Sequence, residues 1–267
     1  MRVFNTMELL EEENKLRPIL KLLKDKHSCV SIKMGTAAEG NSFEDIIRIK
    51  HLVQDQLPVI VKIGGPEARN DLKELLKIGV DGFIAPLVES VYALKLFIMT
   101  LIESAGEKRF KRLIKGINIE TITTYKNLDE IFSAPEISQL QQITIGRGDL
   151  SASLGKKVDD HEVFNIVKDI TKKAQKIGLK VSVGGGITPE EAVKISNEIK
   201  PNRINTRHVT FDLGKCPTIV EAIHYALNFE IELLGISEGR LTRELDNIRC
   251  RVQDLKIRQN VTKTISF

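Results

Sequence analysis

The sequence predicts an α/β protein that folds as a (β/α)8 TIM barrel with an N-terminal helix and an extended C-terminal helix. Short β-branched runs alternate with amphipathic helical runs along most of the 267 residues, which indicates βαβ crossovers and a parallel sheet. Polar or glycine residues follow nearly every strand, as expected where all strand ends face one site. The last forty residues differ, because their apolar positions follow a heptad-like spacing.

A doubly wound open sheet is the competing architecture. Seven strands can be placed in the sequence, whereas a closed barrel needs eight. In an open sheet, however, the site-forming residues gather where the strand order reverses. The barrel is favoured because polar and glycine residues follow strand after strand.

The first half of the chain alternates helix and strand. A helix that begins at Ser42, an N-cap residue, has Asp45 at its capping-box position. A later helix carries Pro66 at its start and Gly79 at its end, and Pro18 can kink or split the first helix. The expected elements are helix 7–26, strand 29–34, helix 42–56, strand 58–65, helix 66–79, strand 81–90 and helix 91–105.

The second half continues the alternation up to a last helix over 218–227. One of its helices is expected to begin at the N-cap Thr188, with Pro189 in the first helical position. The expected elements are strand 114–121, helix 127–135, strand 141–146, helix 160–178, strand 179–187, helix 188–199, strand 203–211 and helix 218–227.

The chain therefore divides into a barrel domain over 1–227 and a C-terminal helical extension over 228–267. Apolar residues in the extension recur at steps of four and three, which is a short a/d seam. Two interpretations stay open: the helix packs on its own domain, or it packs on another subunit. The seam residues are Leu241, Leu245, Ile248, Val252 and Leu255.

Composition and charge exclude several classes of function. Forty basic and 36 acidic residues give a formal net charge of +4, so no basic footprint for nucleic acid is evident. The N-terminal segment is acidic where a signal peptide is apolar, and no run approaches the roughly 18 apolar residues of a membrane span. Three widely spaced cysteines form neither a disulfide framework nor a zinc site. A cytoplasmic protein without a membrane or nucleic-acid partner is expected.

Two carboxylates stand at the ends of sequential strands. Glu120 follows one strand and Asp149 follows the next, and neighbouring strands lie about 4.8 Å apart. Such a pair can hold one Mg²⁺ ion, which usually takes one or two protein carboxylates together with waters and substrate oxygens. The alternative is that each carboxylate only caps a helix.

The Gly-Arg-Gly-Asp stretch at the end of the fifth strand suggests an anion site. Gly148 lets an anion approach the backbone, and the amides of Gly148 and Asp149 can donate to a carboxylate. Arg147 can add a bidentate contact. The alternative is an ordinary glycine-containing loop.

Four segments taken together resemble the HpcH/HpaI aldolase–citrate lyase family over roughly residues 28 to 225. The order and spacing are more specific than any one segment, and they point to a branch with KIGG and GRxD motifs. The segments are VKIGGPEARNDLKELLKIGVDGFIAPLVES (61–90), INIET (117–121), ITIGRGDLSASLG (143–155) and GGGIT (184–188).

This resemblance implies a pyruvate/phosphoenolpyruvate-type barrel and supplies the eighth strand. It implies metal-assisted carbon–carbon bond cleavage or formation through an enolate, with homo-oligomers that exchange a C-terminal helix. The family's metal ligands match Glu120 and Asp149, so Mg²⁺ or Mn²⁺ is the expected cofactor. Its carboxylate-binding amides match Gly148 and Asp149.

The chain departs from the family pattern at the proton-transferring residues. The arginine that follows the second strand in pyruvate aldolases is Lys62 here, and IKMGTAAEG (32–40) lacks the usual histidine. The catalytic candidates are Lys33, Lys62 and Glu39, and a Schiff base on Lys33 is a lesser alternative. The substrate-binding candidates are Lys62, Arg147, Gly148, Asp149 and Glu67. His208 is the histidine nearest these strand ends, and the alternative is a buried structural role.

The leading hypothesis is a class II, metal-dependent aldolase-type lyase that acts on a small 2-oxo acid. The alternatives are a citrate-lyase-like enzyme for acyl thioesters, a barrel that binds without turnover as a scaffolding subunit, and a barrel that binds phosphorylated compounds at its glycine-rich GGGIT segment. A homo-oligomer joined through the C-terminal helix is expected.

Overall fold

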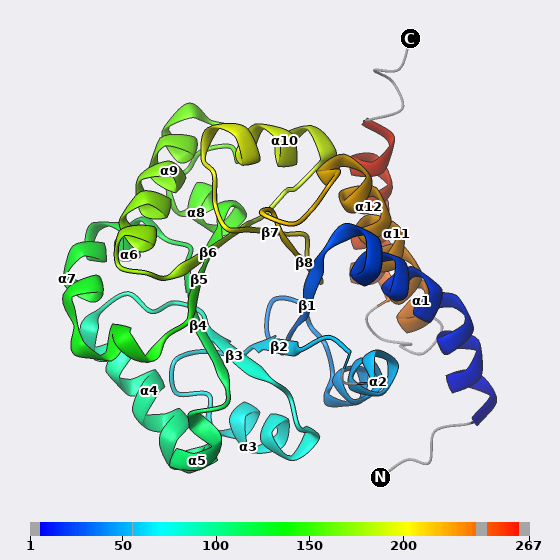
Figure 1. The fold of residues 1–267 in the computed structure, drawn as a ribbon, viewed down its shortest axis with the longest axis horizontal. Helices are drawn as coiled ribbons and strands as arrows, with labels where there is room; N and C mark the ends of the chain where they lie inside the picture. The colour runs from blue at the N-terminus through cyan, green and yellow to red at the C-terminus, as the bar shows by residue number, and fades with distance from the viewer. Residues whose placement is uncertain (1–5, 55, 239–244, 262–267) are drawn as a thin grey trace.

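A closed barrel forms the centre of the protein (Figure 1). The computed structural model describes residues 6–54, 56–238 and 245–261, and within them eight strands close in chain order. The strands are β1 (Cys29–Gly35), β2 (Val59–Lys62), β3 (Gly82–Ala85), β4 (Ile114–Ile119), β5 (Gln142–Gly146), β6 (Lys180–Gly184), β7 (Arg203–Asn205) and β8 (Val209–Asp212). The predicted barrel is confirmed, and the open sheet is wrong.

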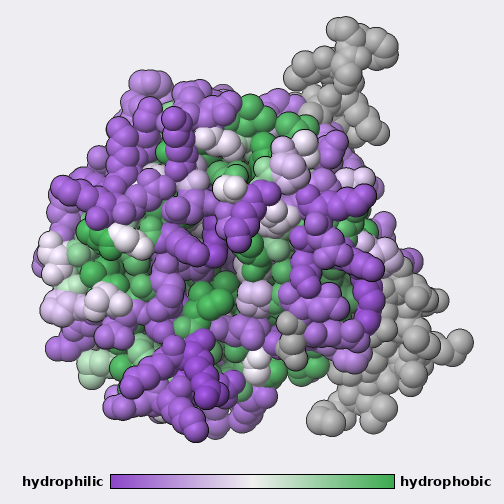
Figure 2. Space-filling view, in the orientation of Figure 1, coloured by the Kyte–Doolittle hydropathy of each residue, from purple (hydrophilic) through white to green (hydrophobic). Residues whose placement is uncertain are grey.

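Helices surround the barrel on the outside (Figure 1). They are α1 (Thr6–His27), α2 (Phe43–Val53), α3 (Arg69–Ile78), α4 (Val91–Ala105), α5 (Glu107–Phe110), α6 (Ile122–Lys126), α7 (Leu128–Ser133), the 3-10 turn η1 (Pro135–Gln139), α8 (Arg147–Ser153), α9 (His161–Lys176), α10 (Pro189–Glu198), α11 (Ile219–Glu238) and α12 (Leu245–Val261). Among the described residues, no helix is long and apolar enough to cross a membrane. Hydrophilic residues cover most of the face shown in Figure 2.

Local signals set most of the helix ends. Ser42 and Asp45 form the predicted capping box of α2, and the Thr188 side chain caps α10. Gly79 ends α3 in the left-handed conformation, with φ of 84°. Pro66 was expected to start that helix but lies in a turn in which the Ala68 amide bonds back to Gly65, so the helix begins at Arg69.

The predicted strand over 203–211 is in fact a hairpin. β7 and β8 are antiparallel and are joined by three residues, and β8 is also antiparallel to β1. The turn is held by Glu230 of α11, whose carboxylate accepts hydrogen bonds from Thr206 Oγ1 at 2.5 Å and from the His208 amide at 2.6 Å. Because β7 is parallel to β6, this turn lies at the carboxyl ends of the parallel strands.

Alternation along the strands separates an apolar outer layer from a polar interior. Ile32 and Met34 of β1 belong to the apolar core between strands and helices, whereas Ser31 and Lys33 face the barrel axis. Further polar side chains line the interior: Gln142, Thr144, Ser182, Asn205 and Thr210. The polar interior leads directly into the cavity at the carboxyl ends of the strands.

The last helices pack on the barrel of their own chain. α11 runs past residue 227, where the sequence predicts that the barrel domain ends. On α12, Leu255 is 1% exposed and Val252 packs against the core. Leu241 lies outside the described residues, as do the side chains of Leu245 and Ile248. Exchange of this helix between subunits stays a prediction.

Candidate active site

A polar cavity of about 310 Å³ opens at the carboxyl ends of the parallel strands. A larger surface hollow of about 810 Å³ lies at their opposite ends, beside Asp81 and Ile114. The chemistry favours the smaller cavity, because charged groups from many elements converge there. Its charged lining residues are Lys33, Lys62, Arg207 and Arg258, with Glu39, Glu120, Asp149 and Asp254.

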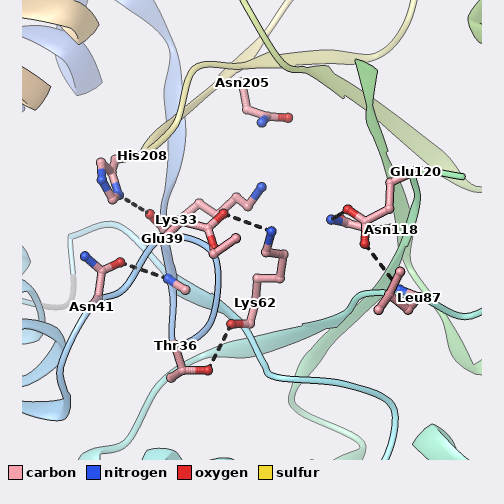
Figure 3. A network of polar contacts seen from close by, with 12 residues as sticks. Lys33, Thr36, Glu39, Asn41, Lys62, Leu87, Asn118, Glu120, Asn205 and His208 are labelled. Carbon is pink, nitrogen blue, oxygen red and sulfur yellow. Dashed lines mark hydrogen bonds and ion pairs between the residues drawn. The ribbon is translucent and has the colours of Figure 1, made fainter. Parts of the chain in front are cut away.

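Glu120 follows β4 and is held in place by two hydrogen bonds. Its Oε2 accepts from Asn118 Nδ2 at 2.8 Å, and its Oε1 accepts from the Leu87 amide at 3.2 Å (Figure 3). Leu87 has a φ of 54°, a left-handed conformation that is strained for a residue with a branched side chain. The Glu120 side chain is therefore buried and oriented before any ligand binds.

Asp149 in the first turn of α8 approaches the same place as Glu120. A Cβ at Gly146 would stand 3.4 Å from Glu120 Oε2 and 3.9 Å from Asp149 Oδ2. The missing side chain leaves room between the two carboxylates. Within the described residues, no group of three or more His, Cys, Asp or Glu side chains could hold a metal. Two carboxylates with open positions fit Mg²⁺ or Mn²⁺, which complete their coordination with water or substrate oxygens.

Lys33, Lys62 and Glu39 form a buried cluster on the other side of the cavity. Lys62 Nζ lies 3.1 Å from Glu39 Oε1, and both side chains are nearly buried. Figure 3 shows the two lysines entering from one side and Glu120 with Asn118 from the other. The ammonium groups of Lys33 and Lys62 therefore face the Glu120 carboxylate across the cavity.

Burial and charge shift the titration of two members of this cluster. Burial lowers the pKa of Lys33 below its ordinary value; the charges of Glu39 and Glu120 oppose this shift, and that of Lys62 adds to it. Burial acts to raise the pKa of Glu39, but the charges of Lys33 and Lys62 outweigh it and hold that pKa below its ordinary value. Lys33 is thus easier to deprotonate than a free lysine.

The Glu39 carboxylate is confined by the strand beside it. A Cβ at Gly35 would collide with the Glu39 carboxylate, so glycine is required there for this packing. Glu39 Oε2 is buried and has no hydrogen-bond partner among the described residues. One oxygen of Glu39 is engaged by Lys62, and the other is not.

The backbone amides after β5 face the glycine-rich end of β6. A Cβ at Gly185, whose φ is 93°, would lie 2.6 Å from the Gly148 nitrogen and 3.0 Å from the Arg147 nitrogen. Glycine at this position keeps the Gly148 amide uncovered. The first turn of α10 beyond it carries Glu190 and Glu191, which disfavours the predicted alternative of a phosphate at GGGIT.

Two predicted substrate-binding residues lie outside the cavity lining. Arg147 is 2% exposed and donates from Nη1 to Glu191 Oε2 at 2.5 Å and from Nε to the Gly185 carbonyl at 3.3 Å. Glu67 is exposed and pairs with Arg69 at 3.2 Å. Sequence reasoning placed both near strand ends but could not show that their side chains turn away from the cavity.

His208 is a structural residue that joins the β7–β8 turn to β1. It is 1% exposed, and its Nδ1 lies 2.8 Å from the Lys33 carbonyl oxygen. Burial lowers the pKa of His208, although Glu230 and the Lys33 carbonyl oppose this. A neutral imidazole that donates from Nδ1 fits these contacts.

The structure adds three polar residues to the site. Asn118 precedes Glu120 by two positions on β4, so period-two alternation could have found it. Arg207 follows β7, and its position just after a strand was the one feature of the sequence that could have indicated a place in the site. Arg258 of α12 had no sequence signal, because nothing in a helical tail shows that it reaches the mouth of the barrel.

Comparison with known proteins identifies the family of the chain. The family model described as HpcH/HpaI aldolase/citrate lyase matches residues 46–192, which is more than half of the chain. Among proteins of curated function, the sequence has no significant match.

Solved structures of this type share the fold at low sequence identity. An HpcH/HpaI aldolase from Desulfitobacterium hafniense DCB-2 has a TM-score of 0.54 and 16% identity, covering 70% of this chain and 88% of that one. The citrate synthase SbnG has a TM-score of 0.53 and 16% identity, and the match covers 75% of this chain and 92% of SbnG. Macrophomate synthase has a TM-score of 0.52 and 15% identity, and the match covers 72% of this chain and 83% of the synthase.

With the family model matched across the strands that carry Glu120 and Asp149, the chain belongs to the HpcH/HpaI aldolase/citrate lyase family.

Proposed function

We propose that this protein is a metal-dependent, aldolase-type lyase that cleaves or forms a carbon–carbon bond in a small 2-oxo acid through an enolate. Family membership supports an aldolase- or lyase-type function. The observation that carries the finer proposal is the approach of Glu120 Oε2 and Asp149 Oδ2 to one point beside Gly146.

Glu120 and Asp149 would hold Mg²⁺ or Mn²⁺. When bound, the ion polarises the 2-oxo group and stabilises the negative charge that develops on it. Asn118 and the Leu87 amide keep Glu120 aimed at this position, so little side-chain reorganisation accompanies binding.

The substrate carboxylate would lie against the amides of Gly148 and Asp149, and the bare Gly185 leaves the Gly148 amide accessible. Lys62 supplies positive charge from the opposite wall. Its pairing with Glu39 holds the ammonium in one position, where it acts as a point charge without the planar fork of an arginine.

Lys33 and Glu39 are the groups that would move protons. In the cleavage direction, the base takes the proton from the hydroxyl group next to the breaking bond. The bond's electron pair then passes into the 2-oxo acid fragment, and an aldehyde leaves. Return of the proton to the enolate carbon gives the oxo acid. A lysine with a lowered pKa can serve as this base near neutral pH.

Exchange of the methyl protons of pyruvate in D₂O tests the proposal directly. Proton NMR with Mg²⁺ or Mn²⁺ is expected to show loss of the methyl signal, and Glu120→Gln is expected to abolish it. Glu67→Gln is the matched control, since it makes the same change outside the cavity. Exchange that persists in Glu120→Gln would overturn the metal site.

A barrel that binds without turnover is the second candidate. It is favoured by one observation: within the described residues, no histidine lines the cavity. This candidate predicts that pyruvate with Mn²⁺ raises the melting temperature while no proton exchange occurs. A citrate-lyase-like action on acyl thioesters, a cytoplasmic location and a homo-oligomer joined through α12 remain further predictions.

A further inference from the structure

We propose that α4 carries a contact surface for a second copy of this chain, with the two helices antiparallel about a two-fold axis at Met99. The surface, called the α4 face below, consists of Tyr92, Lys95, Leu96, Met99 and Glu103. None of these residues lines the cavity, so the contact is independent of the proposed function.

The helix α4 is apolar around its whole circumference. Lys95 and Glu103 are the only charged residues among its 15 residues. Its inner side packs into the core through Leu94, Phe97 and Leu101, each of which is 0% exposed. A helix that is apolar all round is normally buried on every side. The composition of α4 therefore indicates that its outer side is covered as well.

The outer side of α4 is exposed in the single chain. Tyr92 is 73% exposed and Met99 is 47% exposed, with the half-buried Leu96 between them. Their spacing of four and three residues places them in one stripe along the helix. Large apolar side chains gathered in a stripe mark a contact surface, whereas scattered ones are ordinary. Figure 1 shows α4 on the outside of the barrel, on the side opposite α11 and α12, so this contact does not involve the C-terminal helix.

The charges of the α4 face are arranged symmetrically about Met99. Lys95 lies four residues before Met99 and Glu103 lies four residues after it, so all three share one side of the helix. When a second α4 packs antiparallel with the two-fold axis at Met99, each Lys95 lies opposite Glu103 of the other copy. A parallel pair in register would place like charges opposite each other, which is unfavourable. The α4 face is therefore complementary to itself in the antiparallel arrangement.

Both charged residues are available for this contact. Lys95 is exposed and makes no hydrogen bond or ion pair within the part of the chain that the structure describes. Glu103 Oε2 accepts from Arg69 Nη1 at 2.7 Å, but Arg69 also pairs with Glu67 at 3.2 Å. Glu103 can therefore share its carboxylate with Lys95 of the second copy while Arg69 keeps a partner.

The C-terminal end of α4 has room for Tyr92 of the second copy. Tyr92 lies seven residues before Met99, so the same symmetry places it opposite Gly106, seven residues after Met99. A Cβ at Gly106 would meet no atom within 4 Å, and a hollow of about 410 Å³ opens beside it between α4, α5 and η1. A tyrosine suits this place, because its ring buries apolar area while its hydroxyl stays in water. The apolar lining residues of the hollow are Ile98, Ile102, Phe110 and Pro135.

Sedimentation equilibrium of charge-reversal variants tests the contact. The native chain is expected to be at least a dimer at micromolar concentration. Lys95→Glu and Glu103→Lys should each raise the dissociation constant of the contact at least about tenfold, because the symmetry opposes like charges twice. The double variant restores opposite charges and should return the dissociation constant to near its native value. Lys172→Glu, the same reversal at an exposed position on α9, is the matched control and should have no effect.

A disulfide across the axis provides a second measurement. Met99 faces its own symmetry mate, so Met99→Cys combined with Cys250→Ser, which removes the exposed native thiol, should form an intermolecular disulfide on mild oxidation. Ile177→Cys, at another exposed apolar position, is the matched control and should stay unlinked. A monomeric native chain, an assembly that withstands both charge reversals, a double variant that restores nothing, or no disulfide in the Met99→Cys protein would each overturn the contact.

Discussion

Lys62 and Glu39 form a nearly buried ion pair in the wall of the cavity, with Nζ and Oε1 separated by 3.1 Å and side-chain exposures of 8% and 9%. The pair joins β2 to the loop after β1. It also leaves the second oxygen of Glu39 without a partner among the described residues. A buried pair of this kind is costly to break, because the remaining charge is left uncompensated.

Glu39→Gln is expected to slow pyruvate proton exchange by about 100-fold or more, which is the usual contribution of a positioned acid or base. The change removes a proton acceptor and leaves Lys62 unpaired. Mn²⁺ affinity should stay the same, because Glu120 and Asp149 are untouched. Unchanged exchange in a folded, Mn²⁺-binding variant would exclude Glu39 from proton transfer.

Asp149→Asn is expected to abolish metal-dependent exchange without affecting the fold. Asp149 is exposed, so the change in the free energy of unfolding should be within about 0.5 kcal/mol. Urea denaturation and Mn²⁺ titration of the same preparation check both parts. A variant that binds Mn²⁺ as tightly as the native protein would show that Asp149 is only a helix-terminal residue.

Glu191→Ala is expected to lower the free energy of unfolding by about 3 kcal/mol, because it leaves the buried Arg147 guanidinium without its ion pair. Glu190→Ala, in the same helical turn but exposed, is the matched control and should have little effect. If Arg147 is structural, the folded Glu191→Ala protein still binds 2-oxo acid. Selective loss of binding with full stability would return Arg147 to the substrate site.

His208 is expected to make the protein less stable as the pH falls. Its pKa is lowered by burial in the folded protein, so the unfolded chain takes up a proton first, near its ordinary pKa of 6.5. Between that pH and the lower folded pKa, the free energy of unfolding decreases with decreasing pH. Denaturation from pH 7.5 to 5 should show a steeper decline for the native protein than for His208→Asn. If the stability of the two proteins declined in parallel with falling pH, His208 would not be the cause of the decline.

Strand and helix positions were largely predictable, because they depend on local patterns. The capping residues Ser42 and Thr188 and the C-terminal Gly79 mark helix ends whose chemistry lies within a few residues. The hairpin over 203–212 was not predictable in this way. Its turn carries none of the usual glycine, proline or asparagine signals, and Glu230, which holds it, lies 22 residues beyond His208.

Of the candidate site, the carboxylates at the strand ends were predictable from the sequence, but the direction of the Arg147 side chain was not. Glu120 and Asp149 were found because sequential parallel strands bring their carboxyl ends together. Arg147 follows the same strand as Asp149, yet its side chain pairs with Glu191, 44 residues away. Which acid neutralises a given arginine depends on packing, so residue type and spacing could not decide it.

By itself, the sequence determined the alternation of helices and strands and the pair of carboxylates at the ends of two sequential strands, since these follow from local periodicity and from chain order in a parallel sheet. Only the tertiary structure decided the direction of β8, the inward turn of Lys62 and Arg207, and the position of Arg258 over the cavity. Each of these depends on contacts between residues far apart in the chain, such as Arg251 with Glu39, and local propensity carries no information about them.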